Sequence, residues 1–85
     1  HALMEHEGVA EVAVIGIPDP RLGEVGMAWV VPHGELDGDD LLAWARERLA
    51  NFKVPRRVAF IDALPRNASA KVIKFELRAK FDALA

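Results

Sequence analysis

Residues 9–31, which read VAEVAVIGIPDPRLGEVGMAWVV, decide the fold, because two apolar runs flank one turn-forming segment. The first run, 9–17, is almost continuously apolar and rich in β-branched residues, which is typical of a strand buried on both faces. The second run, 25–31, alternates large apolar side chains on one face with small ones and Val30 on the other. The prolines, aspartate and glycine of 18–24 predict a turn. We therefore expect an antiparallel hairpin with a longish connection.

Helices are expected on both sides of this hairpin in the sequence. Residues 2–7 suit the end of a helix, and Gly8 is well placed to stop it. Downstream, residues 38–51 repeat apolar side chains at helical spacing and leave Arg46 and Glu47 toward water. Asp37 can cap the start of this helix through its carboxylate.

The last third of the chain adds one strand and one helix. Residues 57–62, RVAFID, predict a short strand after a proline. From about residue 72, Ile73, Leu77 and Phe81 follow at four-residue spacing and predict a final helix, with Leu84 on the same stripe. The element order is α-β-β-α-β-α. It predicts an α+β fold with a small, three-stranded, largely antiparallel sheet flanked by helices.

Composition restricts the classes of function. The 85 residues are expected to form a single domain, 1–85, and because the chain begins with His1 we expect it to be a piece of something longer. The net charge of -2 argues against nucleic acid as a partner. No apolar run approaches the roughly 20 residues of a transmembrane segment. The absence of cysteine excludes disulfides and thiolate sites and fits a cytoplasmic protein.

Lys71 stands out among the candidate functional residues. The six residues before it, PRNASA, include no acidic side chain, so its ammonium is open to an outside anion. The predicted strand and helix on either side anchor the loop, which favours a reproducible position for the lysine. An ammonium on a flexible stem commonly binds phosphate or carboxylate. A cation at a helix start opposes the helix dipole, which favours function over local stability as the reason for it.

Other polar residues have simpler interpretations. The three histidines lack the spacing of metal ligands and are expected to be solvated surface residues, so no metal site is predicted: His1, His6 and His33. Arg56 and Arg57, after Lys53, form a small basic cluster that is expected to lie in a solvated loop.

Three stretches carry a resemblance to a known family. They are V-A-E-V-A-V-I-G-I-P-D at 9–19, F-K-V-P at 52–55, and L-P-R-x-x-x-x-K-V-x-K-x-E-L-R at 64–78. In this order and spacing they closely resemble the C-terminal domain of the adenylate-forming superfamily. That superfamily contains acyl-CoA synthetases, adenylation domains of nonribosomal peptide synthetases and luciferases. The resemblance covers essentially the whole chain and is closest to an acyl-CoA synthetase of the fatty-acid–CoA ligase type.

The resemblance implies a role within a longer, AMP-forming acid–thiol ligase. In the family, a large N-terminal domain binds ATP, Mg²⁺ and a carboxylic acid, and the small C-terminal domain closes over it. Lys71 matches the adenylation lysine, whose ammonium bridges the carboxylate and the α-phosphate. The domain then rotates, and CoA attacks the acyl-adenylate. Lys53 matches a lysine common in the family, to which we assign a contact role toward CoA or between domains, with a solvated surface lysine as the alternative. The implied partners are the chain's own N-terminal domain, ATP or acyl-adenylate, and CoA; alone, the 85 residues are expected to be inactive.

Ala70 departs from the family pattern, which usually has glycine before the lysine. If this position requires a positive φ, alanine costs about 1 kcal/mol or shifts the loop. Two other readings stay open: the lid of a peptide-synthetase adenylation domain, and a stand-alone α+β interaction or regulatory module without catalysis.

Overall fold

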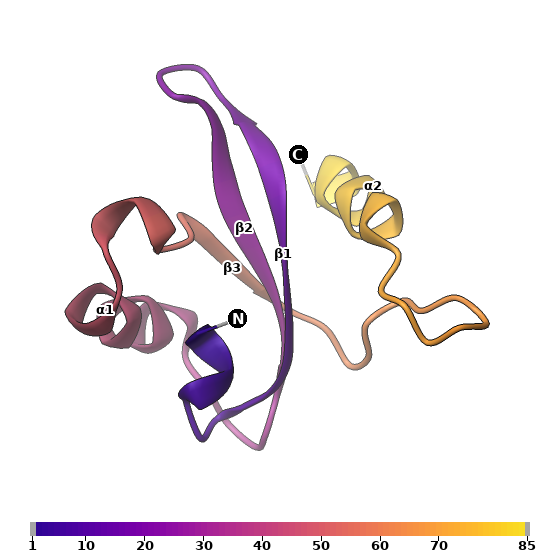
Figure 1. The fold of residues 1–85 in the computed structure, drawn as a ribbon, viewed down its shortest axis with the longest axis horizontal. Coiled ribbons are helices and arrows are strands. Elements are labelled where there is room, and N and C mark those ends of the chain that lie inside the picture. Colours follow the sequence, from indigo (N-terminus) through magenta and orange to yellow (C-terminus); the bar gives the residue numbers. More distant parts are fainter. Residues whose placement is uncertain (1, 85) are drawn as a thin grey trace.

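The computed structural model describes residues 2–84, with the exception of the Phe52 side chain, and these residues form three strands, two α-helices and two 3-10 turns (Figure 1). His1, expected to be a surface histidine, lies outside the described residues. The elements are η1 (Ala2–Glu5), β1 (Val9–Asp19), β2 (Gly23–Pro32), α1 (Gly38–Arg48), η2 (Asn51–Lys53), β3 (Arg57–Phe60) and α2 (Lys74–Leu84). The α+β class and the element order are confirmed, although η1 is a single 3-10 turn rather than an α-helix.

β1 and β2 form the expected antiparallel hairpin, but it is longer than predicted. Pairing continues to Asp19 opposite Gly23, so only three residues connect the strands and the predicted longish loop is wrong. Asp19 makes this tight connection possible, because its Oδ1 accepts hydrogen bonds from the backbone N–H groups of Arg21 and Leu22, each at 2.8 Å. Gly23 follows with φ of 82°, which glycine adopts at no steric cost.

Both faces of the hairpin are buried, as the sequence predicts. On one face, side chains of β1 and β2 pack under α2; we call this cluster the α2-side core: Ala13, Ile15, Ile17, Met27, Trp29, Leu64 and Leu77. On the other face they pack under α1 in the α1-side core: Leu3, Val9, Ala28, Val30, Leu41, Leu42, Ala45 and Val54. A shift in register between Val9 and Glu11 lets Val9 join the α1-side core although its odd-numbered neighbours face α2.

The cap of α1 is the one expected. Asp37 Oδ1 accepts hydrogen bonds from the N–H groups of Asp39 at 2.8 Å and Asp40 at 3.1 Å. Leu41 and Ala45 are fully buried against the sheet. The helix ends at Arg48 rather than at residue 51, and a separate 3-10 turn, η2, follows.

β3 completes the sheet beside β2, in the order β1-β2-β3. It runs parallel to β2, from Met27 opposite Arg57 to Val30 opposite Phe60, and ends two residues earlier than predicted. A parallel pair needs a long crossover, which α1 and η2 provide. The sheet therefore contains one long antiparallel pair and one short parallel pair.

α2 covers the face of the hairpin opposite to the one that α1 covers (Figure 1). It begins at Lys74, two residues later than predicted, because Val72 is still in extended backbone paired with Arg66. Leu77 is fully buried and Phe81 packs beside it, whereas Leu84, expected on the same stripe, is exposed. Within residues 2–84, neither helix is long and apolar enough to cross a membrane.

Candidate functional site

Lys71 lies at the exit of a small hairpin. Arg66 pairs with Val72 in an isolated antiparallel bridge, and the N–H of Asn67 donates to the carbonyl of Lys71 at 3.0 Å. The N–H of Ala70 donates to the carbonyl of Asn67 at 2.9 Å and closes a turn inside the hairpin. We call residues 66–72 the Lys71 hairpin. A three-residue connection of this kind combines a tight turn with one residue in the left-handed region.

Ala70 is that left-handed residue, with φ of 64°. Among the described residues it is the only one other than glycine with a positive φ. The position before Lys71, where the family usually has glycine, therefore does take a positive φ in this chain. An L-residue in this region costs roughly 1–2 kcal/mol, and three-residue hairpins favour glycine there. The peptide directly before Lys71 is therefore strained.

Side chains of the hairpin hold this strained backbone. Asn67 Oδ1 accepts hydrogen bonds from the N–H groups of Ser69 at 2.9 Å and Lys71 at 3.1 Å. Arg66 Nη1 donates to the carbonyl of Ala70 at 2.8 Å, and its Nη2 pairs with Glu11 Oε1. Because Glu11 belongs to β1, the hairpin is attached to the sheet as well as to itself.

The Lys71 side chain is exposed, and no carboxylate of the described residues forms an ion pair with it. Because α2 begins only at Lys74, Lys71 is not at a helix start, and the expected conflict with the helix dipole is wrong. Lys71 lines an open hollow of about 500 Å³ together with Asn67, Val72, Ile73, Lys74 and Phe75. Phe75 is 74% exposed at the rim of this hollow, which is unusual for a large aromatic side chain.

Lys53 lies on the opposite face of the sheet. It ends η2, and the next residue, Val54, is buried in the α1-side core. Lys71 is followed by Val72, which packs against the α2-side core. Figure 1 shows the same division, with α1 and η2 on one side of the sheet and the Lys71 hairpin on the other. The two candidate lysines therefore do not share a site.

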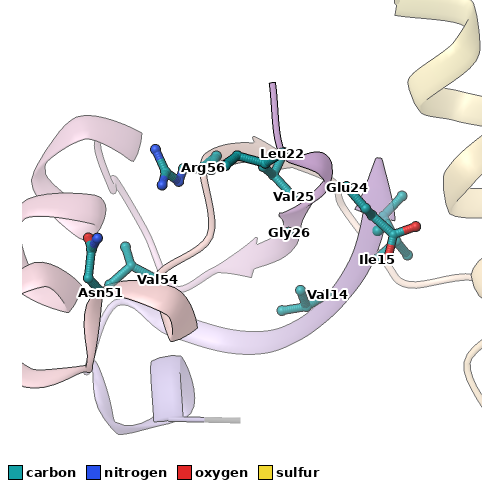
Figure 2. Close-up of a pocket in the computed structure, with 10 residues that line it drawn as sticks. Val14, Ile15, Leu22, Glu24, Val25, Gly26, Asn51, Val54 and Arg56 are labelled. Atoms are coloured by element: carbon teal, nitrogen blue, oxygen red, sulfur yellow. The ribbon is translucent and has the colours of Figure 1, made fainter. Parts of the chain in front are cut away.

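A groove lies on the side of the sheet that carries Lys53 (Figure 2). Its volume is about 550 Å³, and its walls combine apolar side chains, most of them from the hairpin, with polar residues of β2, η2 and the connection before β3. The polar groups are Glu24, Asn51 and Arg56, and the apolar side chains include Val14, Leu22 and Val54. Arg56, expected in a solvated loop, borders this groove, and its backbone N–H donates to the carbonyl of Gly26 at 2.8 Å. Sequence reasoning noted the basic cluster but had no signal for the groove, because its walls come from distant segments.

The histidines take different positions from one another. His6 is partly buried: its Nδ1 accepts a hydrogen bond from the N–H of Gly8 at 2.9 Å, and its ring meets Trp44 edge-on at 5.0 Å. The expectation of a solvated His6 is therefore wrong, whereas His33 is exposed. Within residues 2–84, no three histidine or acidic side chains lie together in a way that could hold a metal ion.

Comparisons with known proteins agree on one family. Residues 1–71 match the family model described as AMP-binding enzyme C-terminal domain. A Rhodococcus jostii protein named 3-[(3aS,4S,7aS)-7a-methyl-1,5-dioxo-octahydro-1H-inden-4-yl]propanoyl:CoA ligase is 60% identical over 92% of this chain and 16% of its own length. A feruloyl-CoA synthase from an Amycolatopsis species is 54% identical over 93% of this chain and 16% of its own length.

A solved structure extends the agreement to the fold. The Mycobacterium tuberculosis fatty acyl CoA synthetase superposes with a TM-score of 0.87 at 38% identity, over 96% of this chain and 16% of that one. The 85-residue chain thus spans about 16% of the length of these relatives.

Proposed function

This chain belongs to the family of AMP-binding enzyme C-terminal domains, and from that premise we propose that it is the mobile lid of an ATP-dependent carboxylate–CoA ligase. In the first step of that reaction, a carboxylate oxygen attacks the α-phosphorus of ATP, forming an acyl-adenylate and releasing pyrophosphate. In the second step, the CoA thiol attacks the acyl carbonyl, and AMP leaves with the electrons of the broken bond. The names of the relatives as CoA ligases and synthetases support this assignment.

Lys71 is the residue we assign to the first step. One observation carries the assignment: the ammonium is exposed without a carboxylate partner among the described residues, while its backbone is fixed at a hairpin exit. Two anions must approach each other to form the adenylate, and negative charge grows on the phosphoryl oxygens. A cation presented at a defined position lowers this barrier by positioning and charge neutralisation.

The face that carries Lys71 is also suited to being covered by another domain. Phe75 is 74% exposed and flanks the hollow beside Lys71. Aromatic side chains are enriched in the contact surfaces between proteins. In the proposal, the large domain of the parent chain covers this surface during adenylation and holds ATP and its Mg²⁺.

The opposite face is assigned to the second step. Lys53 and the groove that contains Arg56 lie across the sheet from Lys71. A hinge rotation of the lid exchanges one face for the other at a single reaction centre. Lys53 then contacts CoA or the large domain, with the sheet separating it from the adenylation lysine.

The test compares the two half-reactions in the parent enzyme. Lys71→Ala is expected to lower carboxylate-dependent pyrophosphate release by two or more orders of magnitude, on the order of a lost transition-state charge contact. Thioester formation from supplied acyl-adenylate is expected to survive. Lys80→Ala is the matched control, because Lys80 is an exposed lysine of α2 outside the hairpin.

Lys53→Ala gives the reciprocal test. It is expected to slow thioester formation from supplied adenylate and to leave pyrophosphate release unchanged. If Lys71→Ala leaves both steps near the wild-type rate, this chain is an interaction or regulatory module and the lid assignment is wrong.

A further inference from the structure

The position of the Lys71 ammonium depends on the peptide that joins it to Ala70. We infer that Arg66 is a positioning residue for adenylation, because it holds this strained peptide in the orientation that presents Lys71. The inference rests on the proposed function of Lys71 and extends it to a second side chain, which does not itself touch the substrate.

One planar peptide unit is held from both of its sides. Its carbonyl oxygen, on Ala70, accepts a hydrogen bond from Arg66 Nη1 at 2.8 Å. Its N–H, on Lys71, donates to Asn67 Oδ1 at 3.1 Å. Because a peptide unit is planar, fixing both its oxygen and its nitrogen fixes the plane that leads into the Lys71 Cα. On the other side of that Cα, the carbonyl of Lys71 accepts a hydrogen bond from the N–H of Asn67 at 3.0 Å, so the backbone that carries the Lys71 side chain is held at both ends.

Arg66 also connects this peptide to the sheet. While Nη1 binds the hairpin, Nη2 pairs with Glu11 of β1. The guanidinium is planar, with its donors in a rigid fork, so the two contacts are geometrically coupled. Lys71 is thus positioned relative to the strand and not only relative to its own loop.

Ala70 makes this support necessary. Its φ of 64° is unfavourable for an L-residue, so the free loop tends to relax by rotating the peptide next to Lys71. The hydrogen bond from Arg66 opposes that rotation directly. Loss of Arg66 should therefore misplace Lys71 without unfolding the domain, because neither Arg66 nor Glu11 belongs to the buried core.

Arg78 provides a matched comparison within the chain. Its Nη2 donates to the carbonyl of Gly16 at 3.3 Å, so Arg78, like Arg66, is an exposed arginine that contacts β1. Unlike Arg66, it lies in the middle of α2, outside the Lys71 hairpin. A purely structural contribution of exposed arginines would appear equally in both.

The experiment uses the full-length parent enzyme with Arg66→Gln, Arg66→Lys and Arg78→Gln. We expect Arg66→Gln to lower the single-turnover adenylation rate constant by roughly tenfold, the equivalent of about one charge-assisted hydrogen bond. The KM for ATP, the thioester rate from supplied adenylate and the Tm are expected to stay near wild type. Arg66→Lys should lose less than Arg66→Gln, and Arg78→Gln should change neither rate.

A second substitution tests the cause. Ala70→Gly removes the steric cost of the positive φ, so it should restore part of the adenylation rate in the Arg66→Gln background. If Arg66→Gln slows both half-reactions equally, or if Arg78→Gln has the same effect, Arg66 contributes only structure and the inference is overturned. If Lys71→Ala leaves the adenylation rate unchanged, the proposed function itself is overturned. If Lys71→Ala lowers the adenylation rate strongly but Arg66→Gln leaves it unchanged, only the inference about Arg66 is overturned.

Discussion

Two turns in this chain solve the same backbone problem with different residues. At the tip of the β1–β2 hairpin, Asp19 accepts two backbone N–H groups and Gly23 takes the positive φ. In the Lys71 hairpin, Asn67 accepts two backbone N–H groups and Ala70 takes the positive φ. In the first turn the side-chain hydrogen bonds come from Asp19, whereas the second turn also contains Arg66, which contacts both the Ala70 carbonyl and Glu11 of β1. Strain is thus confined to the turn that precedes the candidate catalytic lysine.

Removing the side chain that accepts the backbone hydrogen bonds should affect the adenylation rate in one turn and not in the other, and this is the largest difference that we expect between them. Asn67→Ala deletes both hydrogen bonds that its Oδ1 accepts, including the one from the N–H of Lys71, and each is worth about 1 kcal/mol. We expect roughly a tenfold loss of adenylation rate in the parent enzyme. Asp19→Ala is the control and should leave adenylation unchanged, because its turn lies away from Lys71. Equal losses in both variants would contradict a special role for the Lys71 hairpin.

Gly23→Ala makes the tip of the long hairpin resemble the Lys71 hairpin. No atom lies within 4 Å of the position that a Cβ would occupy, so only the backbone conformation opposes the substitution. The left-handed region should lower the free energy of unfolding by about 1 kcal/mol. Urea unfolding of the chain measures this, and an unchanged midpoint would show that the turn can take a negative φ.

Ala70→Gly makes the opposite exchange. It removes the cost of the positive φ but increases the conformational entropy of the unfolded chain, and the two effects partly cancel. A net stabilisation of about 0.5 kcal/mol is expected. The same unfolding measurement applies, with Ala68→Gly as control, since Ala68 has no positive φ and that variant should be destabilised.

Acidification should affect the tip of the long hairpin through Asp19. Hydrogen bonds from the N–H groups of Leu22 and Arg21, with a smaller contribution from the charge of Arg56, lower the pKa of Asp19 below its ordinary value of 3.8. Because the folded pKa is depressed, the carboxylate supports the turn above the unfolded pKa, and this support is lost as the pH falls through the folded pKa.

An NMR titration of the Asp19 carboxyl and the Leu22 amide measures this effect. The midpoint is expected below 3.8, and the amide response should vanish in Asp19→Asn. A midpoint at or above 3.8 would contradict the hydrogen bonds of this turn.

Local patterns were sufficient to predict much of the fold. The alternation of 25–31 assigns each side chain of β2 to a face, and the Asp37 cap depends only on its immediate neighbours. The parallel pairing of β3 with β2 was not predicted, although the helix expected between these strands is the long crossover that a parallel pair needs. His6 looked solvated because Trp44, which it contacts, is distant in the sequence.

In the candidate site, too, features with a local sequence signal could be predicted, and features that depend on distant residues could not. The absence of acidic residues before Lys71 is a local signal, and it gave the exposed ammonium correctly. The pairing of Arg66 with Glu11 joins residues 55 positions apart and left no trace in either segment. The positive φ of Ala70 was equally hidden, since alanine carries no preference for the left-handed region and only the resemblance to the family pointed to it.

The division of the sheet into two cores has a consequence for how such a domain can evolve. Because side chains of a strand alternate, Met27 and Trp29 belong to one core, and Ala28 and Val30 belong to the other. Substitutions in one core can therefore accumulate with little effect on the other, so the two surfaces are free to diverge separately. A one-residue insertion in β2 has the opposite effect, since it exchanges the two sets at once. Selection on this domain should tolerate changes of side chain within each face far better than changes in the length of the strand between them.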